Sequence, residues 1–204
     1  KDMKYKCITG GPISENCYLL IDEKTNQAAV VDPGFLNDVL LNEIKKYTVQ
    51  RILLTHGHFD HIWEADRLHE MLGVPVCAYE TEAAFAADDK QNGSLLMMYE
   101  SITCKVHEAF KDGETFQIGE VPVTVLHTPG HTAGGVSYIT PDAVFTGDTL
   151  MGYSVGRCDL PTGNSAELRE SLKKLAALPG NPDICGGHGP VTTLEDEKRR
   201  NPYL

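Results

Sequence analysis

The chain has 204 residues, and its length fits one globular domain. Hydrophobic residues make up 41% and charged residues 23%, which excludes a disordered or collagen-like chain, and a core of this size folds without a disulfide scaffold. The 18 Lys and Arg residues against 29 Asp and Glu give a net charge of −11. This charge repels phosphate backbones and anionic lipid, so we expect neither nucleic acid nor a membrane as a partner.

The predicted elements alternate between short strands and amphipathic helices. Apolar runs predict strands, and apolar residues that recur every three or four positions predict helices. In chain order these elements are strands at 17–21 and 28–31, a turn at 32–34, a helix through 40–47, a strand at 51–54, a helix through 62–72, strands at 121–126 and 143–146, and a helix through 168–175 with Ser165 as its N-cap. The alternation predicts an α/β architecture with one core, as a single domain over residues 1–204.

Two segments between these elements carry weaker predictions. The polar stretch 88–94 is interpreted as a surface loop inside the domain. Met97, Met98 and Tyr99 could line a substrate groove, but their spacing favours a place in the core.

The cysteines and the start of the chain bear on the cellular compartment. Residues 1–6 are charged and lead into no apolar segment, so we expect no secretory signal peptide. The cysteines show no C-x-x-C pair, and we interpret all of them as reduced, mostly buried thiols of a cytoplasmic protein: Cys7, Cys17, Cys77, Cys104, Cys158 and Cys185. The oligomeric state cannot be inferred from the sequence.

A dense group of metal-ligand residues directly follows the strand at 51–54. The run from His56 to His61 contains three imidazoles and one carboxylate within six residues. Imidazole nitrogen and carboxylate oxygen are the usual ligands of zinc. In a continued strand, His56 and His58 project to the same side, and the following turn can direct Asp60 and His61 toward a second position.

Three further candidate ligands follow downstream, each beside a glycine that allows close backbone approach. They are His131, Asp148 and His188. Together with the first group they make seven ligands. A single tetrahedral ion uses fewer than this, and seven are enough for two adjacent ions that share one ligand. We expect His69 and His107 to be ordinary structural histidines, and His127 to support the site without binding metal.

The four motifs that carry these residues resemble those of the metallo-β-lactamase superfamily in order and spacing. They are Thr55-His56-Gly57-His58-Phe59-Asp60-His61, Pro129-Gly130-His131-Thr132, Phe145-Thr146-Gly147-Asp148 and Gly187-His188-Gly189. The chain looks most similar to short glyoxalase II-like hydrolases, that is, hydroxyacylglutathione hydrolase-like enzymes. The resemblance implies an α/β (α+β) fold, a four-layer αβ/βα sandwich with two facing mixed sheets, helices outside, and metals at one sheet edge.

The resemblance also assigns roles to the ligands. One metal is expected on His56, His58 and His131, and a second on Asp60, His61 and His188, with Asp148 bridging both. Two zinc ions are the expected cofactors, although iron or manganese suit the same donors. Lactam-hydrolysing relatives commonly carry a cysteine at the position of Asp148, so we do not expect β-lactam hydrolysis.

The expected activity is metal-dependent hydrolysis of a thioester such as S-lactoylglutathione. A hydroxide between two metal ions would attack the thioester carbonyl. Asp60 and Asp148 are the expected catalytic residues, as ligands that also orient the hydroxide. Cys158 beside Arg157 is a competing candidate nucleophile, but no base is identifiable next to it, and we expect an incidental thiol.

Substrate recognition is less clearly predicted. Arg157 matches a position where glutathione-using relatives carry a basic residue, and it either binds a substrate carboxylate or pairs locally with Asp159. We expect a single domain without the C-terminal helical extension that helps longer glyoxalase II enzymes to bind glutathione. Three alternatives remain: a persulfide dioxygenase with a single iron, a hydrolase of another ester or lactone, and a non-catalytic binding domain.

Overall fold

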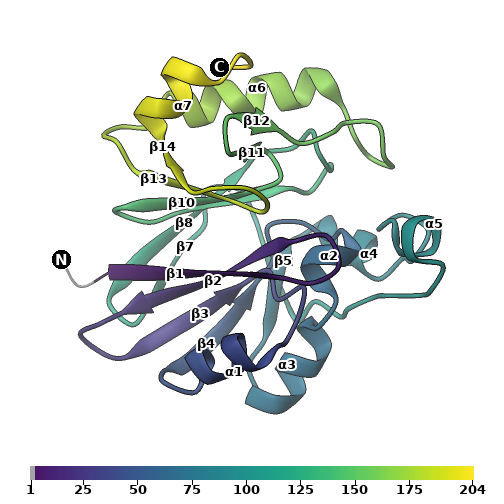
Figure 1. Ribbon diagram of the computed structural model, residues 1–204, viewed down its shortest axis with the longest axis vertical. Helices are drawn as coiled ribbons and strands as arrows, with labels where there is room; N and C mark the ends of the chain where they lie inside the picture. The colour runs from purple at the N-terminus through teal and green to yellow at the C-terminus, as the bar shows by residue number, and fades with distance from the viewer. Residues whose placement is uncertain (1–2) are drawn as a thin grey trace.

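The computed structural model describes residues 3–204, so the first two residues of the charged start lie outside it. The described chain forms four layers, with two six-stranded sheets face to face and helices on their outer sides (Figure 1). This architecture confirms the predicted αβ/βα sandwich of two mixed sheets.

The first sheet holds the N-terminal half of the chain in the order β1-β2-β3-β4-β5-β6. β1, β2 and β3 pair antiparallel, whereas β3 to β6 pair parallel. Its strands are β1 (Met3–Gly10), β2 (Glu15–Asp22), β3 (Gln27–Val31), β4 (Thr48–Leu53), β5 (Val76–Tyr79) and β6 (Glu108–Phe110). The parallel strands all direct their carboxyl ends to the same edge of the sheet.

The second sheet has the order β14-β13-β10-β9-β8-β7, with one parallel pair, β10 and β13. Its strands are β7 (Thr115–Ile118), β8 (Val121–His127), β9 (Val136–Ile139), β10 (Ala143–Gly147), β13 (Asp183–Gly186) and β14 (Thr192–Thr193). A small hairpin follows β10 and consists of β11 (Leu150–Met151) and β12 (Ser154–Val155).

The helices cover the outer faces, with α1 and α3 below the first sheet and α6 and α7 above the second in the view of Figure 1. The helices of the described residues are α1 (Asp38–Ile44), α2 (Phe59–Ile62), α3 (Ala65–Leu72), α4 (Glu82–Ala86), α5 (Ser94–Met98), α6 (Ser165–Ala176) and α7 (Leu194–Arg200), and α2, α4 and α5 lie to one side of the sheets (Figure 1). The N-cap of α6 is Asn164, whose side chain accepts a hydrogen bond from the Glu167 amide, and the prediction of Ser165 as N-cap is wrong. Asparagine and serine both favour this position, so the sequence could not separate two neighbours. No helix within residues 3–204 is long and apolar enough to cross a membrane.

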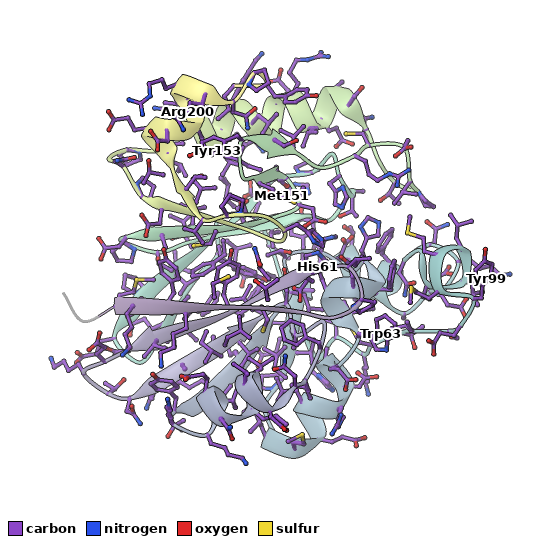
Figure 2. All side chains as sticks on the ribbon, in the orientation of Figure 1. His61, Trp63, Tyr99, Met151, Tyr153 and Arg200 are labelled. Carbon is purple, nitrogen blue, oxygen red and sulfur yellow. The ribbon has the colours of Figure 1, made fainter. Side chains whose placement is uncertain are left out.

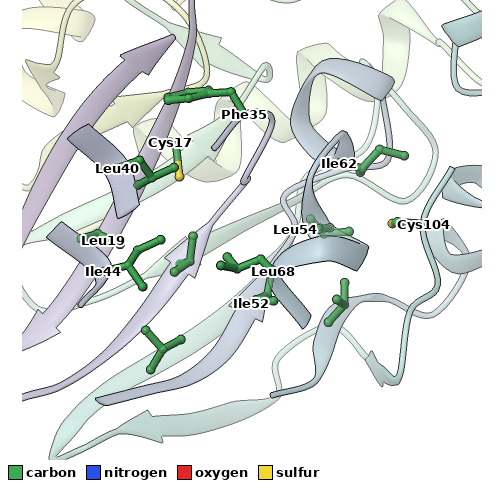
Figure 3. Close-up of a cluster of buried hydrophobic side chains, with 14 of the residues drawn as sticks. Cys17, Leu19, Phe35, Leu40, Ile44, Ile52, Leu54, Ile62, Leu68 and Cys104 are labelled. Carbon is green, nitrogen blue, oxygen red and sulfur yellow. The ribbon is translucent and has the colours of Figure 1, made fainter. Parts of the chain in front are cut away.

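Central strands are buried on both faces, which explains their continuous apolar sequences. In β2, Cys17 and Leu19 face α1 on the outer side of the sheet (Figure 3), while Tyr18 and Leu20 face the second sheet. This alternation follows from the two-residue period of a strand. In β10, Phe145 likewise packs between the sheets. Three apolar layers result, one between the sheets and one beneath each helical layer.

Two segments between α4 and β6 differ from the sequence predictions. The loop at 88–94 is not wholly on the surface, because Asn92 is fully buried and donates hydrogen bonds to the carbonyls of Ala86 and Ile102. Tyr99 is 89% exposed at the tip after α5 (Figure 2), so its predicted place in the core is wrong. Met98 does pack against the core, whereas Met97 is partly exposed.

Candidate metal centre

All seven predicted ligands lie at the edge where the carboxyl ends of strands from both sheets meet. β4 leads into the loop with His56 and His58, and α2 carries Asp60 and His61. β8, β10 and β13 lead into the segments that hold the remaining three, His131, Asp148 and His188. His61 accordingly lies where the two halves of the molecule meet (Figure 2). Residues more than a hundred positions apart thus share one site because each follows a strand.

The first group consists of three histidines whose ligand atoms lie within 4.8 Å of one another: His56, His58 and His131. His58 Nδ1 is 2.9 Å from His131 Nε2. His131 Nε2 is in turn 3.4 Å from Asp148 Oδ2. Three imidazoles with one carboxylate at their side match the donor set of a tetrahedral zinc or iron site.

The second group consists of four residues whose ligand atoms also lie within 4.8 Å of one another: Asp60, His61, Asp148 and His188. His61 Nε2 is 3.3 Å from Asp60 Oδ2 and 3.1 Å from Asp148 Oδ1. His188 Nε2 lies 3.0 Å from Asp60 Oδ2 and 3.5 Å from Asp148 Oδ2. Asp148 thus reaches both groups, and its two carboxylate oxygens can serve two adjacent ions.

Hydrogen bonds at the far side of the imidazole rings fix which nitrogen faces the centre. His131 Nδ1 lies 2.7 Å from the Arg157 carbonyl, and His188 Nδ1 lies 3.2 Å from the Ser14 carbonyl. A carbonyl oxygen only accepts, so Nδ1 carries the proton in both rings. Nε2 is therefore the nitrogen of each ring that faces the centre and is left to bind a metal ion when the ring is neutral.

Asp32 sets the same tautomer in two more rings. Its carboxylate accepts hydrogen bonds from Thr55 Oγ1 at 2.6 Å and from His61 Nδ1 at 2.9 Å. Since the Thr55 hydroxyl proton is used in this way, its oxygen accepts from His56 Nδ1 at 3.0 Å. Nε2 is then the nitrogen of each ring that faces the centre, and it can bind a metal ion when the ring is neutral. The sequence indicated a turn at Asp32 but not this role.

Several buried atoms that face the centre have no hydrogen-bond partner among residues 3–204. They are His56 Nε2, His61 Nε2 and Asp148 Oδ1. A buried polar atom without a partner costs about 1–3 kcal/mol, so such atoms rarely gather without a ligand. Nitrogen and carboxylate oxygen together suit zinc, iron or manganese. The residues present therefore fit two metal ions.

The charges of the site also favour a cation. Burial lowers the pKa of His58 to about 3, so this ring is neutral at pH 7. Burial alone would raise the pKa of Asp148, but the charge of His61 and hydrogen bonds from neighbouring histidines hold it well below its usual range. For His188, the carboxylates of Asp148 and Asp60 outweigh the effect of burial and raise the pKa to about 10. Anionic carboxylates thus draw positive charge to this point.

Glu15 is a buried carboxylate at the base of the site that the sequence analysis did not single out. It is 2% exposed, and its Oε1 lies 3.5 Å from His61 Nδ1. Burial raises its pKa well above the usual value, partly offset by the charge of His61. A Cβ at position 34 would lie 2.8 Å from Glu15 Oε2 and 1.7 Å from the Asp60 carbonyl, which is why Gly34 occupies that place.

Glu82 joins the two loops that carry the three-histidine group. It is 1% exposed, and its Oε2 accepts hydrogen bonds from the Gly57 amide at 3.0 Å and from Thr132 Oγ1 at 2.6 Å. Gly57 lies between His56 and His58, and Thr132 follows His131. One carboxylate on α4 thus sets the spacing between these loops. No ligand-like spacing marks Glu82 in the sequence, since it lies more than twenty residues from either loop.

Replacing Glu82 with glutamine is expected to weaken metal binding at the three-histidine group by about 10–100-fold. The amide oxygen is a neutral and weaker acceptor for the Gly57 amide and the Thr132 hydroxyl. The NH₂ group cannot accept a hydrogen bond, so the carboxylate's further bond from the Gly134 amide is also weakened, and both changes loosen the two loops. A competition titration with a chromophoric chelator measures the change. Glu197→Gln is the matched control, because Glu197 is equally buried but binds the Tyr153 amide beside α7, away from the metal centre (Figure 2). Equal metal affinity in the two variants would contradict the role of Glu82.

A cavity of about 180 Å³ opens onto the centre. Its walls include ligands from both groups, and four apolar side chains face them: Ile13, Phe59, Met97 and Leu160. Arg157 also lines it, while its guanidinium pairs with Asp159 through Nε at 2.6 Å and Nη2 at 2.9 Å. The local pair with Asp159 is thus present, and substrate binding by Arg157 stays a prediction. Met97 lies on the cavity wall, the alternative that its spacing did not favour.

Other residues considered from the sequence lie outside the centre. Burial raises the pKa of the Cys158 thiol, which argues against a reactive thiolate. His69 and His107 stack on each other with ring centroids 4.0 Å apart. His127 stacks on Tyr79, and its Nε2 lies 2.9 Å from the Ala133 carbonyl. All six cysteines are free thiols, as predicted.

Comparison with known proteins places the chain in a family. Residues 10–188 match the family model of the metallo-beta-lactamase superfamily, and the chain belongs to this superfamily. A probable metallo-hydrolase of Bacillus subtilis is 37% identical over 208 residues, covering 99% of this chain and 98% of the relative. A hydroxyacylglutathione hydrolase, GloC, of Haemophilus influenzae is 31% identical over 209 residues, covering 99% and 98%. The protein is thus a metallo-hydrolase of this superfamily.

Solved structures support the same fold. The B3 metallo-beta-lactamase BLEG-1 superposes with a TM-score of 0.92 at 34% identity, covering 98% of this chain and 99% of that one. TTHA1623 in a di-iron-bound form superposes with a TM-score of 0.82 at 33% identity, covering 98% of this chain and 100% of that one. ETHE1 from Myxococcus xanthus superposes with a TM-score of 0.80 at 30% identity, covering 98% of this chain and 84% of that one. One of these structures is a metallo-beta-lactamase and another is in a di-iron-bound form, so the fold alone does not select a substrate.

Proposed function

We propose that this protein is a binuclear metal-dependent hydrolase that cleaves the thioester of a small acyl group, such as S-lactoylglutathione. The observation that carries the proposal is the pair of ligand groups that meet at Asp148, with buried donor atoms directed to both. The similarity to a relative named hydroxyacylglutathione hydrolase supports the choice of thioester. We further propose zinc in both positions, with iron or manganese as alternatives.

Different residues of the chain have different roles in the proposed reaction. Two ions bound by these ligands would supply a Lewis acid for the carbonyl oxygen and a water of lowered pKa. Asp60 Oδ2, which lies between His61 and His188, can accept a hydrogen bond from the attacking water and orient it. The apolar wall formed by Phe59, Met97 and Leu160 excludes bulk water from the small cavity. No cysteine or serine nucleophile is needed.

Metal removal tests the proposal. We expect the purified zinc-loaded protein to release thiol from S-lactoylglutathione, a strong chelator to abolish this release, and added zinc to restore it. Dialysis with a zinc-saturated chelator is the control for chelator binding itself. Turnover that persists without metal would contradict the proposal, as would a fully metal-loaded protein that cleaves no thioester.

Two alternatives are distinguished in the same experiment. A single iron per chain with oxygen uptake on a glutathione persulfide would identify a persulfide dioxygenase, and the di-iron form of a similar structure keeps iron among the candidate metals. The similarity to the B3 metallo-beta-lactamase BLEG-1 makes a β-lactam a necessary member of the substrate panel. A chromogenic cephalosporin, a simple ester and a lactone complete that panel.

A further inference from the structure

The loop that carries His188 has no side chains of its own to hold it in place. This loop, residues 186–189, lies at the end of β13 and consists of three glycines and His188. A Cβ at position 187 would lie 2.2 Å from Asp148 Oδ1, so a larger residue there would displace a ligand. Glycine loses more conformational entropy on folding than any other residue, so contacts from other segments have to fix this loop.

His188 is also the most exposed of the seven ligands. Its side chain is 27% exposed, whereas the other six ligands are buried. Its own packing therefore restrains it less than packing restrains the others, yet His188 Nε2 has to lie close to Asp60 Oδ2 for both atoms to bind one ion. The position of the loop backbone thus determines whether the second group is complete.

One residue of the opposite sheet, Asn16, binds the backbone of this loop at three points. Its side-chain amide donates hydrogen bonds to the carbonyls of Gly186 at 3.0 Å and Gly189 at 2.9 Å. Its backbone amide donates to the carbonyl of Gly187 at 2.7 Å. Asn16 lies on β2 of the first sheet and is 2% exposed, whereas the loop follows the second sheet. Asn16 therefore joins the two sheets beside His188.

A further hydrogen bond fixes which end of the Asn16 side chain faces the loop. The Thr9 hydroxyl on β1 donates to Asn16 Oδ1 at 2.7 Å, which leaves Nδ2 directed to the two loop carbonyls. Carbonyl oxygens only accept, so a donor is required at this end of the side chain. The neighbouring Tyr18 hydroxyl donates to the Gly186 carbonyl at 2.7 Å and supports the start of the loop.

We propose that Asn16 is the positioning residue for the metal ion of the second group. It holds the loop so that His188 Nε2 reaches the ion that Asp60 and His61 bind. The loops of the three-histidine group are joined by Glu82 instead. Loss of the Asn16 donors therefore weakens one of the two metal positions and spares the other. The inference rests on the binuclear centre of the proposed function.

A stepwise metal titration of Asn16→Asp tests the proposal. Aspartate has the shape of asparagine and still accepts from Thr9, but it cannot donate to the carbonyls of Gly186 and Gly189. We expect the affinity for the ion of the second group to fall about 10–100-fold, and the affinity for the other ion to stay within about threefold. Competition with a chromophoric chelator measures both affinities. His188→Ala removes a ligand of the second group alone and identifies the binding step of that group.

Asn201→Asp is the matched control. Asn201 is 4% exposed, and its side-chain amide donates to the Ser154 carbonyl, in a segment that holds no metal ligand. It follows Arg200, which lies away from His61 (Figure 2). We expect this variant to bind both ions as the parent protein does. Unchanged affinities in Asn16→Asp would overturn the proposal, as would an equal loss at both metal positions, because Asn16 would then support only the fold as a whole.

Thr9→Val provides the test if Asn16→Asp does not fold. It removes the hydroxyl that orients the Asn16 amide, and Thr9 is exposed on an edge strand, so the change leaves the core intact. We expect the affinity for the ion of the second group to fall about 2–10-fold. An unchanged affinity in Thr9→Val would overturn the proposal.

These measurements need no turnover, so they separate this inference from the proposed reaction. Selective loss of one ion in Asn16→Asp, in a protein that cleaves no thioester, would retain the role of Asn16 and reject the thioesterase. A parent protein that binds two ions and cleaves thioesters, with both affinities unchanged in Asn16→Asp, would reject the role of Asn16 and retain the thioesterase.

Discussion

Replacing Asp148 with asparagine is expected to lower turnover by about 10³-fold or more and to reduce the metal content to one ion per chain or fewer. Asp148 has one oxygen 3.1 Å from His61 Nε2 and the other 3.4 Å from His131 Nε2, so it is the ligand that both groups share. The amide keeps the shape but loses the negative charge that holds two cations close together. Metal analysis of the purified variant and thiol release measure the two effects.

The control for this variant is Asp183→Asn. Asp183 lies on β13 of the same sheet, and its carboxylate accepts a hydrogen bond from the Tyr5 hydroxyl, remote from the ligands. We expect it to retain both metals and full turnover. An Asp148→Asn protein with two tightly bound metals and undiminished activity would refute the bridging assignment.

Replacing Asp32 with alanine is expected to lower the free energy of unfolding of the metal-free protein by about 3–5 kcal/mol. The buried carboxylate accepts bonds from the Thr55 amide at 2.8 Å, from the Thr55 hydroxyl and from His61 Nδ1, and alanine leaves all three donors without a partner. His61 also loses the acceptor that fixes its tautomer, so the second metal binds more weakly.

Denaturant unfolding and metal titration measure these two effects separately. Asp32→Asn keeps one oxygen acceptor. We expect its free energy of unfolding and its metal affinity to lie between those of the parent protein and Asp32→Ala. If Asp32→Ala unfolded at the same denaturant concentration as the parent protein and bound two metals with the same affinity, Asp32 would have no role in supporting the site.

The metal ligands could be predicted from the sequence because each lies in a short motif after a predicted strand. His56, His58, Asp60 and His61 are neighbours along the chain, and strand ends on one edge bring the distant ligands to them. The two-sheet architecture came from the family resemblance, since periodicity alone indicated only α/β layers. The structure adds the two-residue alternation of β2, whose side chains serve two different apolar layers.

The residues that support the ligands could not be predicted in the same way. Glu82 and Glu15 act through contacts with segments far along the chain, and a lone acidic residue carries no local pattern. The spacing of Tyr99 favours the core, but α5 is a short helix at the edge of the molecule, where tertiary packing determines burial. Local patterns thus indicate what binds the metals and give little about what holds the ligands in place.

The most direct test of the account is the number of metal ions in the purified protein, measured by elemental analysis together with protein concentration. Two ligand groups that share Asp148 predict close to two ions per chain, falling to one or fewer in Asp148→Asn. A parent protein that saturates at one ion per chain, and stays at one when Asp148 is replaced, would contradict a binuclear centre.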